Sequence, residues 1–366
     1  MPIPCHSPRS VLLGAPLLCL ACISLSVVMV PPPADAGAKK RVLEPFLSVA
    51  LAANRDGSVI VGKYQTRRAG VRAVRWQNGI MTILGELPGG ERDSRALDIS
   101  ADGKVVVGES ISDRGMEAFR WTAESGIEPL GDLSGGPFRS RASAVSADGK
   151  VVVGEASSAR GREAFRWQAG EMVGLGDLPG RSFRSQAMDV SADGKVIVGV
   201  STGDGGDEAF IWRDGKMTGL GIPEGTRNTR AFGVSDDGKV IVGTAITNRG
   251  LQRAFRWEKG QMTLLGSLPG GAAMSSALDV SAAGHVIVGK ANSAEGAEAF
   301  AHEAGKFRAL GDLPGGAFRS IAYAISGDGE VIVGRAETHG DILEAVRWRK
   351  GAIEALGEHQ AAQPPH

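Results

Sequence analysis

Apolar and polar residues alternate every two positions through much of this chain, and Gly-rich turns interrupt the alternation. Residues 100–110 read SADGKVVVGES, and close copies of this stretch begin at positions 146, 191, 235 and 326. A two-residue period places successive side chains on opposite faces of a β-strand, and Asp-Gly before an apolar run is a strong hairpin signal. The pattern therefore predicts repeated β-hairpins and excludes helical repeats.

The hairpin recurs with a nearly constant period. Its turn glycine occurs seven times, at intervals of 44 to 46 residues, and a Trp follows 18 or 19 positions later in six copies. His302 takes the Trp position in the sixth copy, so all six tryptophans of the chain belong to the repeat. The turn glycines are Gly57, Gly103, Gly149, Gly194, Gly238, Gly284 and Gly329.

Each repeat predicts four short strands. In the second copy these are residues 94–100, 104–110, 116–122 and 126–133, followed by a Gly-rich crossover at 134–140. Such a unit has two apolar faces that it cannot cover alone, so neighbouring units stack. A period near 45 with four strands is typical of propeller blades.

The predicted fold is all-β, a seven-bladed β-propeller with four antiparallel strands per blade, over residues 46–358. A β-solenoid is the alternative, although its coils are usually shorter and need caps. The seventh unit has its own fourth strand, so we expect the ring to close by packing blade seven on blade one, without strand exchange.

Two positions identify the strand nearest the axis. A Ser or Thr lies nine residues before every turn glycine and an Ala lies seven before it, on one face of the first strand. Small side chains are needed where strands crowd around an axis. In the third strand, Phe119 and Trp121 lie on one face and Ala118 and Arg120 on the other. The two aromatic side chains are expected to form the core between blades.

The first 36 residues differ from the rest. His6 and Arg9 precede an apolar run from 11 to 30, and a small-x-small site ends at Ala36. This order predicts a secretory signal peptide at 1–36, with a tail at 37–45 and another at 359–366. An uncleaved membrane anchor is the alternative, because about twenty apolar residues can span a bilayer. The protein is therefore expected to be periplasmic or extracellular.

The positions of the cysteines and the net charge limit the kinds of site and partner to expect. Cys5, Cys19 and Cys22 all lie in the leader, so the mature chain is expected to have no disulfide or thiolate metal site. The formal net charge of +0 gives no reason to expect a nucleic acid or an anionic membrane as a partner.

The stretch EAFRWTAESGIEPLGDLSGG, followed by SRASAVSADGKVVVGEAS, resembles the HAF repeat of predicted exported bacterial proteins. The segments GEMVGLGDLPG and GQMTLLGSLPGG match the middle of that repeat, and the resemblance covers residues 46–358. It implies export and a β-repeat architecture, and it carries no catalytic residues. The leading His of the family pattern is mostly Glu or Arg here, as in Glu117 and Arg72.

Guanidinium groups gather in and beside the crossovers and form the candidate ligand site. Several of them around one channel mouth would suit a carboxylate, a phosphate or an acidic sugar. The alternative is a solvated surface on which Arg pairs with Asp132, Asp177 and Asp312. The candidate residues are Arg92, Arg95, Arg139, Arg184 and Arg319, with the hydroxyls of Ser140, Ser185 and Ser320. Packing and the capping of turn amides is the alternative for the hydroxyls.

The recurring aspartates and the histidines do not form a catalytic or metal-binding pattern. Asp98, Asp189 and Asp279 recur five residues before a turn glycine, so simple alternation places them on the same face as the recurring Ala. They fall in alternate units and are expected to lie well apart around the ring, which favours hydrogen bonding to turn or crossover amides over a shared cation site. The histidines of the repeat occupy unrelated positions, and there is no nucleophile elbow with a His partner. We predict no catalytic residues, no metal and no cofactor.

These observations favour an exported, monomeric, non-catalytic binding or interaction scaffold. Its expected partner is a polysaccharide, a small anionic ligand or an envelope protein. Two alternatives remain: a propeller-type lyase or hydrolase with a site built from non-repeating residues, and a structural component of the cell envelope. Fold class alone does not choose among them.

Overall fold

A computed structural model describes residues 45–66, 70–180, 182–339 and 342–357. These residues belong to one compact unit, Leu43–His366, and contain 28 β-strands and no helix. No helix able to cross a bilayer occurs in this part of the chain. The predicted signal peptide at 1–36, most of the tail at 37–45 and the tail at 359–366 lie outside the described residues, so export remains a prediction.

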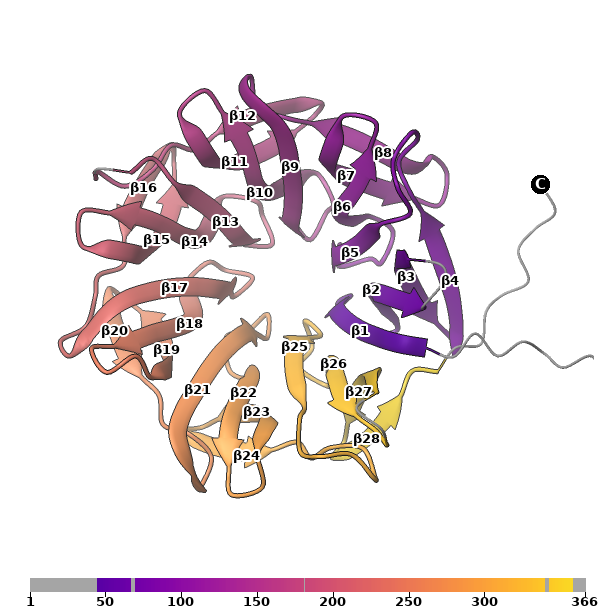
Figure 1. The fold of residues 1–366 in the computed structure, drawn as a ribbon. Helices are drawn as coiled ribbons and strands as arrows, with labels where there is room; N and C mark the ends of the chain where they lie inside the picture. The colour runs from indigo at the N-terminus through magenta and orange to yellow at the C-terminus, as the bar shows by residue number, and fades with distance from the viewer. Residues whose placement is uncertain (1–44, 67–69, 181, 340–341, 358–366) are drawn as a thin grey trace, which may run out of the picture. The chain divides into compact units, whose positions relative to one another are not determined.

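The strands form antiparallel groups of four in which consecutive strands pair (Figure 1). The first strands, which surround the axis, are β1 (Pro45–Ala53), β5 (Ser94–Ile99), β9 (Gly135–Val145), β13 (Ser185–Val190), β17 (Thr226–Val234), β21 (Gly270–Val280) and β25 (Ile321–Ile325). The second strands are β2 (Val59–Thr66), β6 (Val106–Ser112), β10 (Val151–Ser158), β14 (Val196–Gly203), β18 (Val240–Thr247), β22 (Ile287–Ser293) and β26 (Val331–Glu337).

The two outer strands of each group follow in sequence. The third strands are β3 (Gly70–Gln77), β7 (Gly115–Thr122), β11 (Gly161–Gln168), β15 (Gly206–Arg213), β19 (Gln252–Glu258), β23 (Ala297–Glu303) and β27 (Leu343–Arg349). The fourth strands are β4 (Ile80–Gly85), β8 (Gly126–Gly131), β12 (Glu171–Gly174), β16 (Lys216–Gly219), β20 (Gln261–Leu264), β24 (Lys306–Ala309) and β28 (Ala352–Ala355). The all-β propeller with four-stranded antiparallel blades is confirmed.

Five of the sheets have four strands, and one has eight because it joins β1–β4 to β25–β28. That junction is a single parallel pair, Leu47 with Leu343. The same kind of single parallel bridge links other neighbours, as between Arg162 and Arg184 or Ala297 and Arg319. We therefore treat the two halves as separate blades and number the groups blade 1 (β1–β4) to blade 7 (β25–β28).

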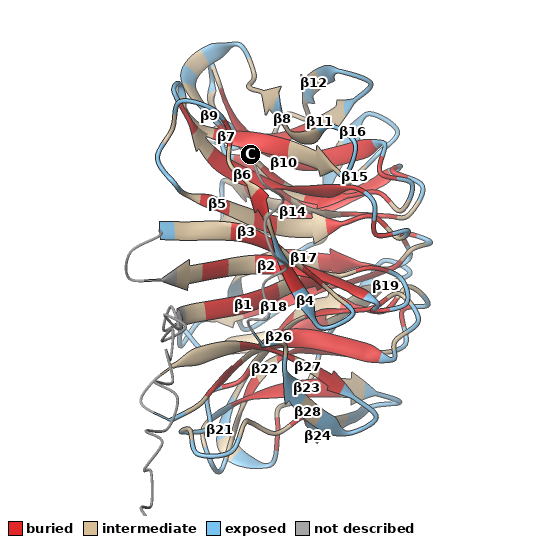
Figure 2. Ribbon diagram, turned by 90° about the vertical axis from the view of Figure 1, so that its right-hand side faces the viewer, coloured by how far each residue is buried: buried red, intermediate tan, exposed pale blue. Residues whose placement is uncertain are grey.

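The hydrophobic core consists of one buried cluster between each pair of adjacent blades. Phe119 of β7 is fully buried against blade 1, together with Val61. Its neighbour Ala118 faces the other way and packs with Phe165 of blade 3. Each blade thus presents large side chains to the preceding blade and small ones to the next, which gives dense interdigitated packing. Buried residues continue through the strands, and exposed ones concentrate at their ends (Figure 2).

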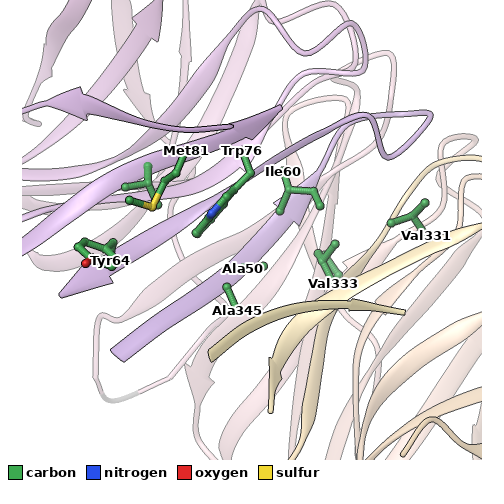
Figure 3. Close-up of a cluster of buried hydrophobic side chains, with 10 residues drawn as sticks. Ala50, Ile60, Tyr64, Trp76, Met81, Val331, Val333 and Ala345 are labelled. Atoms are coloured by element: carbon green, nitrogen blue, oxygen red, sulfur yellow. The ribbon is translucent and has the colours of Figure 1, made fainter. Parts of the chain in front are cut away.

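The closing interface has the same construction. Trp76, Met81 and Tyr64 of blade 1 are buried against Val333 and Ala345 of blade 7 (Figure 3). In these two blades Val74 and Val346 replace the Phe of the repeat, and Trp76 and Trp348 are buried more deeply than the other tryptophans. β28 pairs with β27 of its own blade, so no strand is exchanged at this interface.

Candidate functional site in the axial channel

A β-bulge in the innermost strand decides which side chains reach the channel. In β5 the pairing with β6 shifts between Ala96 and Asp98, and the same shift occurs between Ala187 and Asp189 and between Ala277 and Asp279. A bulge inserts an unpaired residue and turns the following side chains. Simple alternation had predicted that Asp98 shares a face with Ala96. This was wrong, because Ala96 packs into the core toward blade 1 whereas Asp98 lines the channel.

A glycine in the second strand makes room for the bulge. Gly108 lies opposite Ala96, and a methyl group added to it would be 1.9 Å from the carbonyl oxygen of Arg95. The equivalent positions, Gly62, Gly154, Gly199, Gly243, Gly289 and Gly334, have an equally close backbone oxygen. These glycines are required by close approach of two backbones.

Each channel aspartate binds amides of the next blade. The carboxylate of Asp98 accepts a hydrogen bond of 2.7 Å from the N–H of Val145 in blade 3. Asp189 accepts one of 2.8 Å from Val234 in blade 5 and another of 2.7 Å from its neighbour Val190. Asp279 repeats the arrangement, with 2.9 Å from the N–H of Ile325 in blade 7. Hydrogen bonding to amides was predicted, although the donors lie in strands rather than in turns or crossovers.

The three carboxyl groups line one cavity on the axis. Its volume is about 130 Å³, and Val145, Val190 and other first-strand residues complete its wall. The sequence had suggested that these aspartates lie well apart around the ring. The structure corrects this, because all three side chains line the same cavity, where the charge of Asp189 acts on Asp98 and the charges of both act on Asp279. No cluster of three metal-ligating side chains suited to a metal ion occurs in the described residues.

Burial in this narrow cavity raises the pKa of all three acids. Desolvation is the main cause for each. Desolvation and repulsion from Asp189 raise the pKa of Asp98 to about 8. Desolvation raises the pKa of Asp189 to about 7, with a smaller contribution from the charge of Asp236. The pKa of Asp279 lies well above its ordinary value, because of desolvation and then repulsion from Asp189 and Asp98.

A closed circle of backbone hydrogen bonds frames one end of this cavity. Each blade donates one N–H to a carbonyl of the next blade, at 3.0 to 3.2 Å. The pairs are Arg55 with Ala101, Ala101 with Ala147, Ala147 with Ala192, Ala192 with Asp236, Asp236 with Ala282, Ala282 with Gly327, and Asp328 with Arg55.

An ion pair crosses this end of the channel. Arg55 and Asp236 interrupt a series of Ala and Gly in this circle, which Asp328 closes through its backbone N–H. The Nη2 of Arg55 lies 2.6 Å from the Oδ2 of Asp236, so the pair joins blade 1 to blade 5 and borders the cavity. Both side chains are substantially exposed, with 51% and 39% of their surface accessible. A pair this exposed contributes little to stability, so it can open at low cost.

The predicted hydroxyl groups make hydrogen bonds between adjacent blades. Ser140 is buried, and its Oγ accepts a hydrogen bond of 3.0 Å from the N–H of Ala118 in the preceding blade while donating to the carbonyl of Gly131. Ser185 and Ser320 make the same pair of contacts. The contact recurs at every blade, and Ser48 with Ala345 closes the ring. Both hydrogen-bonding functions of these hydroxyls are used between blades.

The predicted arginines belong to the opposite end of the blades, where the crossovers lie. The side chains of Arg92, Arg139 and Arg184 are exposed. Arg95 is engaged by Glu109 at 2.7 Å and by Asp93 at 3.1 Å. The guanidinium of Arg319 pairs with Glu337 at 3.4 Å.

Asp132 and Asp312 bind the crossovers through the backbone. The carboxylate of Asp132 accepts the N–H of Arg139 at 2.6 Å, and Asp312 accepts that of Arg319 at 2.5 Å. The suggested ion pairs between Arg and Asp are therefore replaced, at these two positions, by hydrogen bonds from the backbone amides. None of these contacts tests whether the arginines bind an anion, and that remains a prediction.

A second cavity, of about 400 Å³, lies between blades 5 and 6. It is lined by Arg256, His285, His302 and Glu303. The sequence had placed His285 and His302 at unrelated positions of the repeat, yet they share this cavity. Desolvation and then the charge of Arg256 lower the pKa of His302. The ring of His302 packs edge-on against that of Phe307, so this side chain has a packing role within blade 6.

No family model and no curated protein matches this chain. The HAF-repeat resemblance therefore remains a prediction, as do the predicted partners and the monomeric state.

Solved structures share the fold at low sequence identity. The β-propeller domain of the trilobed protease from Pyrococcus furiosus, which has an open velcro topology, is 12% identical, with a TM-score of 0.56 and coverage of 87% of this chain and 99% of that one. A puromycin-hydrolyzing peptidase from Mycobacterium tuberculosis is 15% identical, with a TM-score of 0.55 and coverage of 87% and 55%. Prolyl oligopeptidase B from Galerina marginata is 8% identical, with a TM-score of 0.56 and coverage of 86% and 50%.

These likenesses show the propeller fold, and they correct the functional expectation. This chain spans about half the length of the two peptidase chains. The sequence had favoured a non-catalytic binding scaffold, but the propellers that it resembles include parts of enzymes that cleave peptides. A propeller of this kind is therefore no evidence for a role outside catalysis, and that expectation was wrong.

Proposed function

We propose that this propeller takes part in peptide hydrolysis, and that its axial cavity receives the positively charged amino group of a peptide. The observation that carries the proposal is the convergence of Asp98, Asp189 and Asp279 on one cavity at the axis. These residues break the repeat, since the other four blades have Ala or Gly at this position. Their convergence on one cavity supports a role in recognising a specific ligand.

The chemistry of the cavity suits an ammonium group. An ammonium group offers three hydrogen-bond donors, and each carboxylate oxygen that already accepts one amide keeps a second lone pair. A nearby positive charge favours the ionised form of a carboxyl group and so offsets the desolvation that raises these pKa values. The volume of about 130 Å³ admits a small head group but not a large ring.

Peptides are the substrate class that the comparisons support. Propellers of similar fold occur in peptidases that are about twice the length of this chain. The residues that line the axial cavity are Ala, Val, Ile, Gly, Asp and Arg, which include no Ser, Cys or Thr nucleophile. The proposal therefore assigns substrate selection to the cavity and bond cleavage to a catalytic unit with which the propeller works.

Isothermal titration calorimetry tests the binding step. We expect trialanine amide with a free amino group to bind at about pH 7.5, and its N-acetylated form to bind at least about tenfold more weakly, because one charged hydrogen-bonded contact is lost. Binding should weaken at about pH 6, where more of the carboxyl groups are protonated. Asp189→Asn should weaken binding. Asp193→Asn, in the exposed turn of the same blade, is the matched control.

Peptide hydrolysis is tested separately, in extracts of the source cells. Removal of this chain by a specific antibody should reduce the cleavage of peptides with free amino groups, and adding back the wild-type protein should restore it. The Asp189→Asn protein should restore it poorly. Unchanged hydrolysis after removal of the chain would contradict a role in peptide cleavage, even if the cavity binds amines.

A further inference from the structure

At the end of the blades where the crossovers lie, blades 2 and 3 each hold a guanidinium group against an aromatic ring. The guanidinium carbon of Arg114 lies 3.9 Å from the ring centroid of Phe138, and that of Arg160 lies 3.9 Å from the ring of Phe183. In each case the Arg comes from the turn between the second and third strands, and the Phe comes from the next blade: Phe138 lies near the start of β9, and Phe183 lies two residues before β13. Stacking of a cation on an aromatic face is favourable.

Blade 6 has the same turn and the same phenylalanine position, but an acidic residue replaces the arginine. Phe318 occupies the crossover position of Phe138 and Phe183, two residues before the buried Ser320. The turn position of Arg114 and Arg160 is taken by Glu295. The ring of Phe318 has no cation stacked on it among the described residues, and the residue is 40% exposed.

The turns of the three blades have the same local geometry. Glu295 donates its N–H to the Oγ of Ser293 at 3.2 Å, as Arg160 does to Ser158 at 3.3 Å and Arg114 to Ser112 at 3.2 Å. In each turn the serine hydroxyl donates to the carbonyl of the glycine that follows. Glu295 therefore occupies the position at which blades 2 and 3 carry their stacked arginine.

The turn and the crossover are also in the same register. The parallel bridge between Ala297 and Arg319 corresponds to the bridge between Arg162 and Arg184 in blades 3 and 4. A methyl group added to Gly296 would lie 2.5 Å from the carbonyl oxygen of Phe318, and the matching distance from Gly161 to Phe183 is 2.8 Å. The residue before each glycine is thus held beside its phenylalanine.

We propose that Phe318 and Glu295 form a binding position for an arginine side chain of a partner polypeptide. The incoming guanidinium stacks on the exposed ring as Arg160 stacks on Phe183, and the carboxylate of Glu295 supplies the opposite charge. The nearby cation Arg319 is paired with Glu337, which reduces its repulsion of the ligand. This position lies at the opposite end of the blade from the axial cavity and is independent of the proposed function.

Fluorine NMR on the full chain, labelled with 4-fluorophenylalanine, tests this proposal. The Phe318 resonance is assigned by its loss in Phe318→Leu. N-acetyl-arginine amide should shift this resonance, and N-acetyl-citrulline amide, which has nearly the same shape without the charge, should not. Glu295→Gln should weaken the arginine response about two- to fivefold, as expected for one exposed charged contact.

Exchanges of charge between blades provide matched variants that keep the fold. Glu295→Arg supplies blade 6 with its own stacked guanidinium, as in blades 2 and 3, and should abolish the response of Phe318. Arg160→Glu should create a new response at Phe183. A Phe318 resonance that arginine does not move, an equal response to citrulline, or an unchanged response in Glu295→Arg would each overturn the proposal.

Discussion

At the scale of single residues, the protonation of the channel aspartates links this site to stability. The pKa of Asp98 is raised to about 8 and that of Asp189 to about 7 in the folded protein, whereas an unfolded Asp titrates near 3.9. The folded protein therefore binds more protons than the unfolded chain between these values. The contribution of these two groups to the free energy of unfolding is fully present below about pH 4. It is lost as the pH rises through about 7 to 8.

We therefore predict that Asp98→Asn and Asp189→Asn combined flatten the fall in melting temperature between about pH 5 and pH 8. The double variant is expected to be less stable at the lower pH, because the NH2 group of each Asn replaces an oxygen and would face a backbone N–H group. Calorimetry across this pH range measures both effects. A pH dependence as steep as that of the wild-type protein would show that other groups cause it.

At the scale of the strand, the bulge and its opposing glycine act as one unit. Gly108→Ala places a methyl group 1.9 Å from the carbonyl oxygen of Arg95 and 3.0 Å from the ring of Phe119, so β5 and β6 must separate. We predict a loss of about 2–4 kcal/mol in the free energy of unfolding, as for overpacking in a tight core. Urea denaturation measures the loss. Gly205→Ala, which meets no atom within 4 Å, is the control and should change stability little.

The strands themselves were largely predictable, because the two-residue alternation and the Asp-Gly turns are local signals. Strand order, the innermost strand and the aromatic core all agree with the sequence. The bulge was missed because its signal, a glycine across from Ala96, has meaning only once the two strands are paired. The direction of Asp98 depended on that pairing.

At the scale of the whole molecule, the ring closes by the same contacts that join its inner blades. Ser48 accepts the N–H of Ala345 at 2.8 Å across the closure, as Ser140 accepts that of Ala118 at 3.0 Å within the ring. We predict that Ser48→Ala and Ser140→Ala each lower the free energy of unfolding by about 1–3 kcal/mol, because each leaves a buried amide without a partner. Urea denaturation compares them. A negligible effect of Ser48→Ala alone would mean that the ring is open in solution.

The sequence by itself determined the period, the four strands of each repeat and the residues of the inter-blade core, because each of these depends on neighbours within about 45 residues. Only the tertiary structure decided what meets at the axis. Asp98, Asp189 and Asp279 come from alternate blades, and Arg55 pairs with Asp236 across 181 residues. Their proximity follows from ring closure, which brings equivalent positions of all blades to one centre, and no local pattern in the chain encodes that distance.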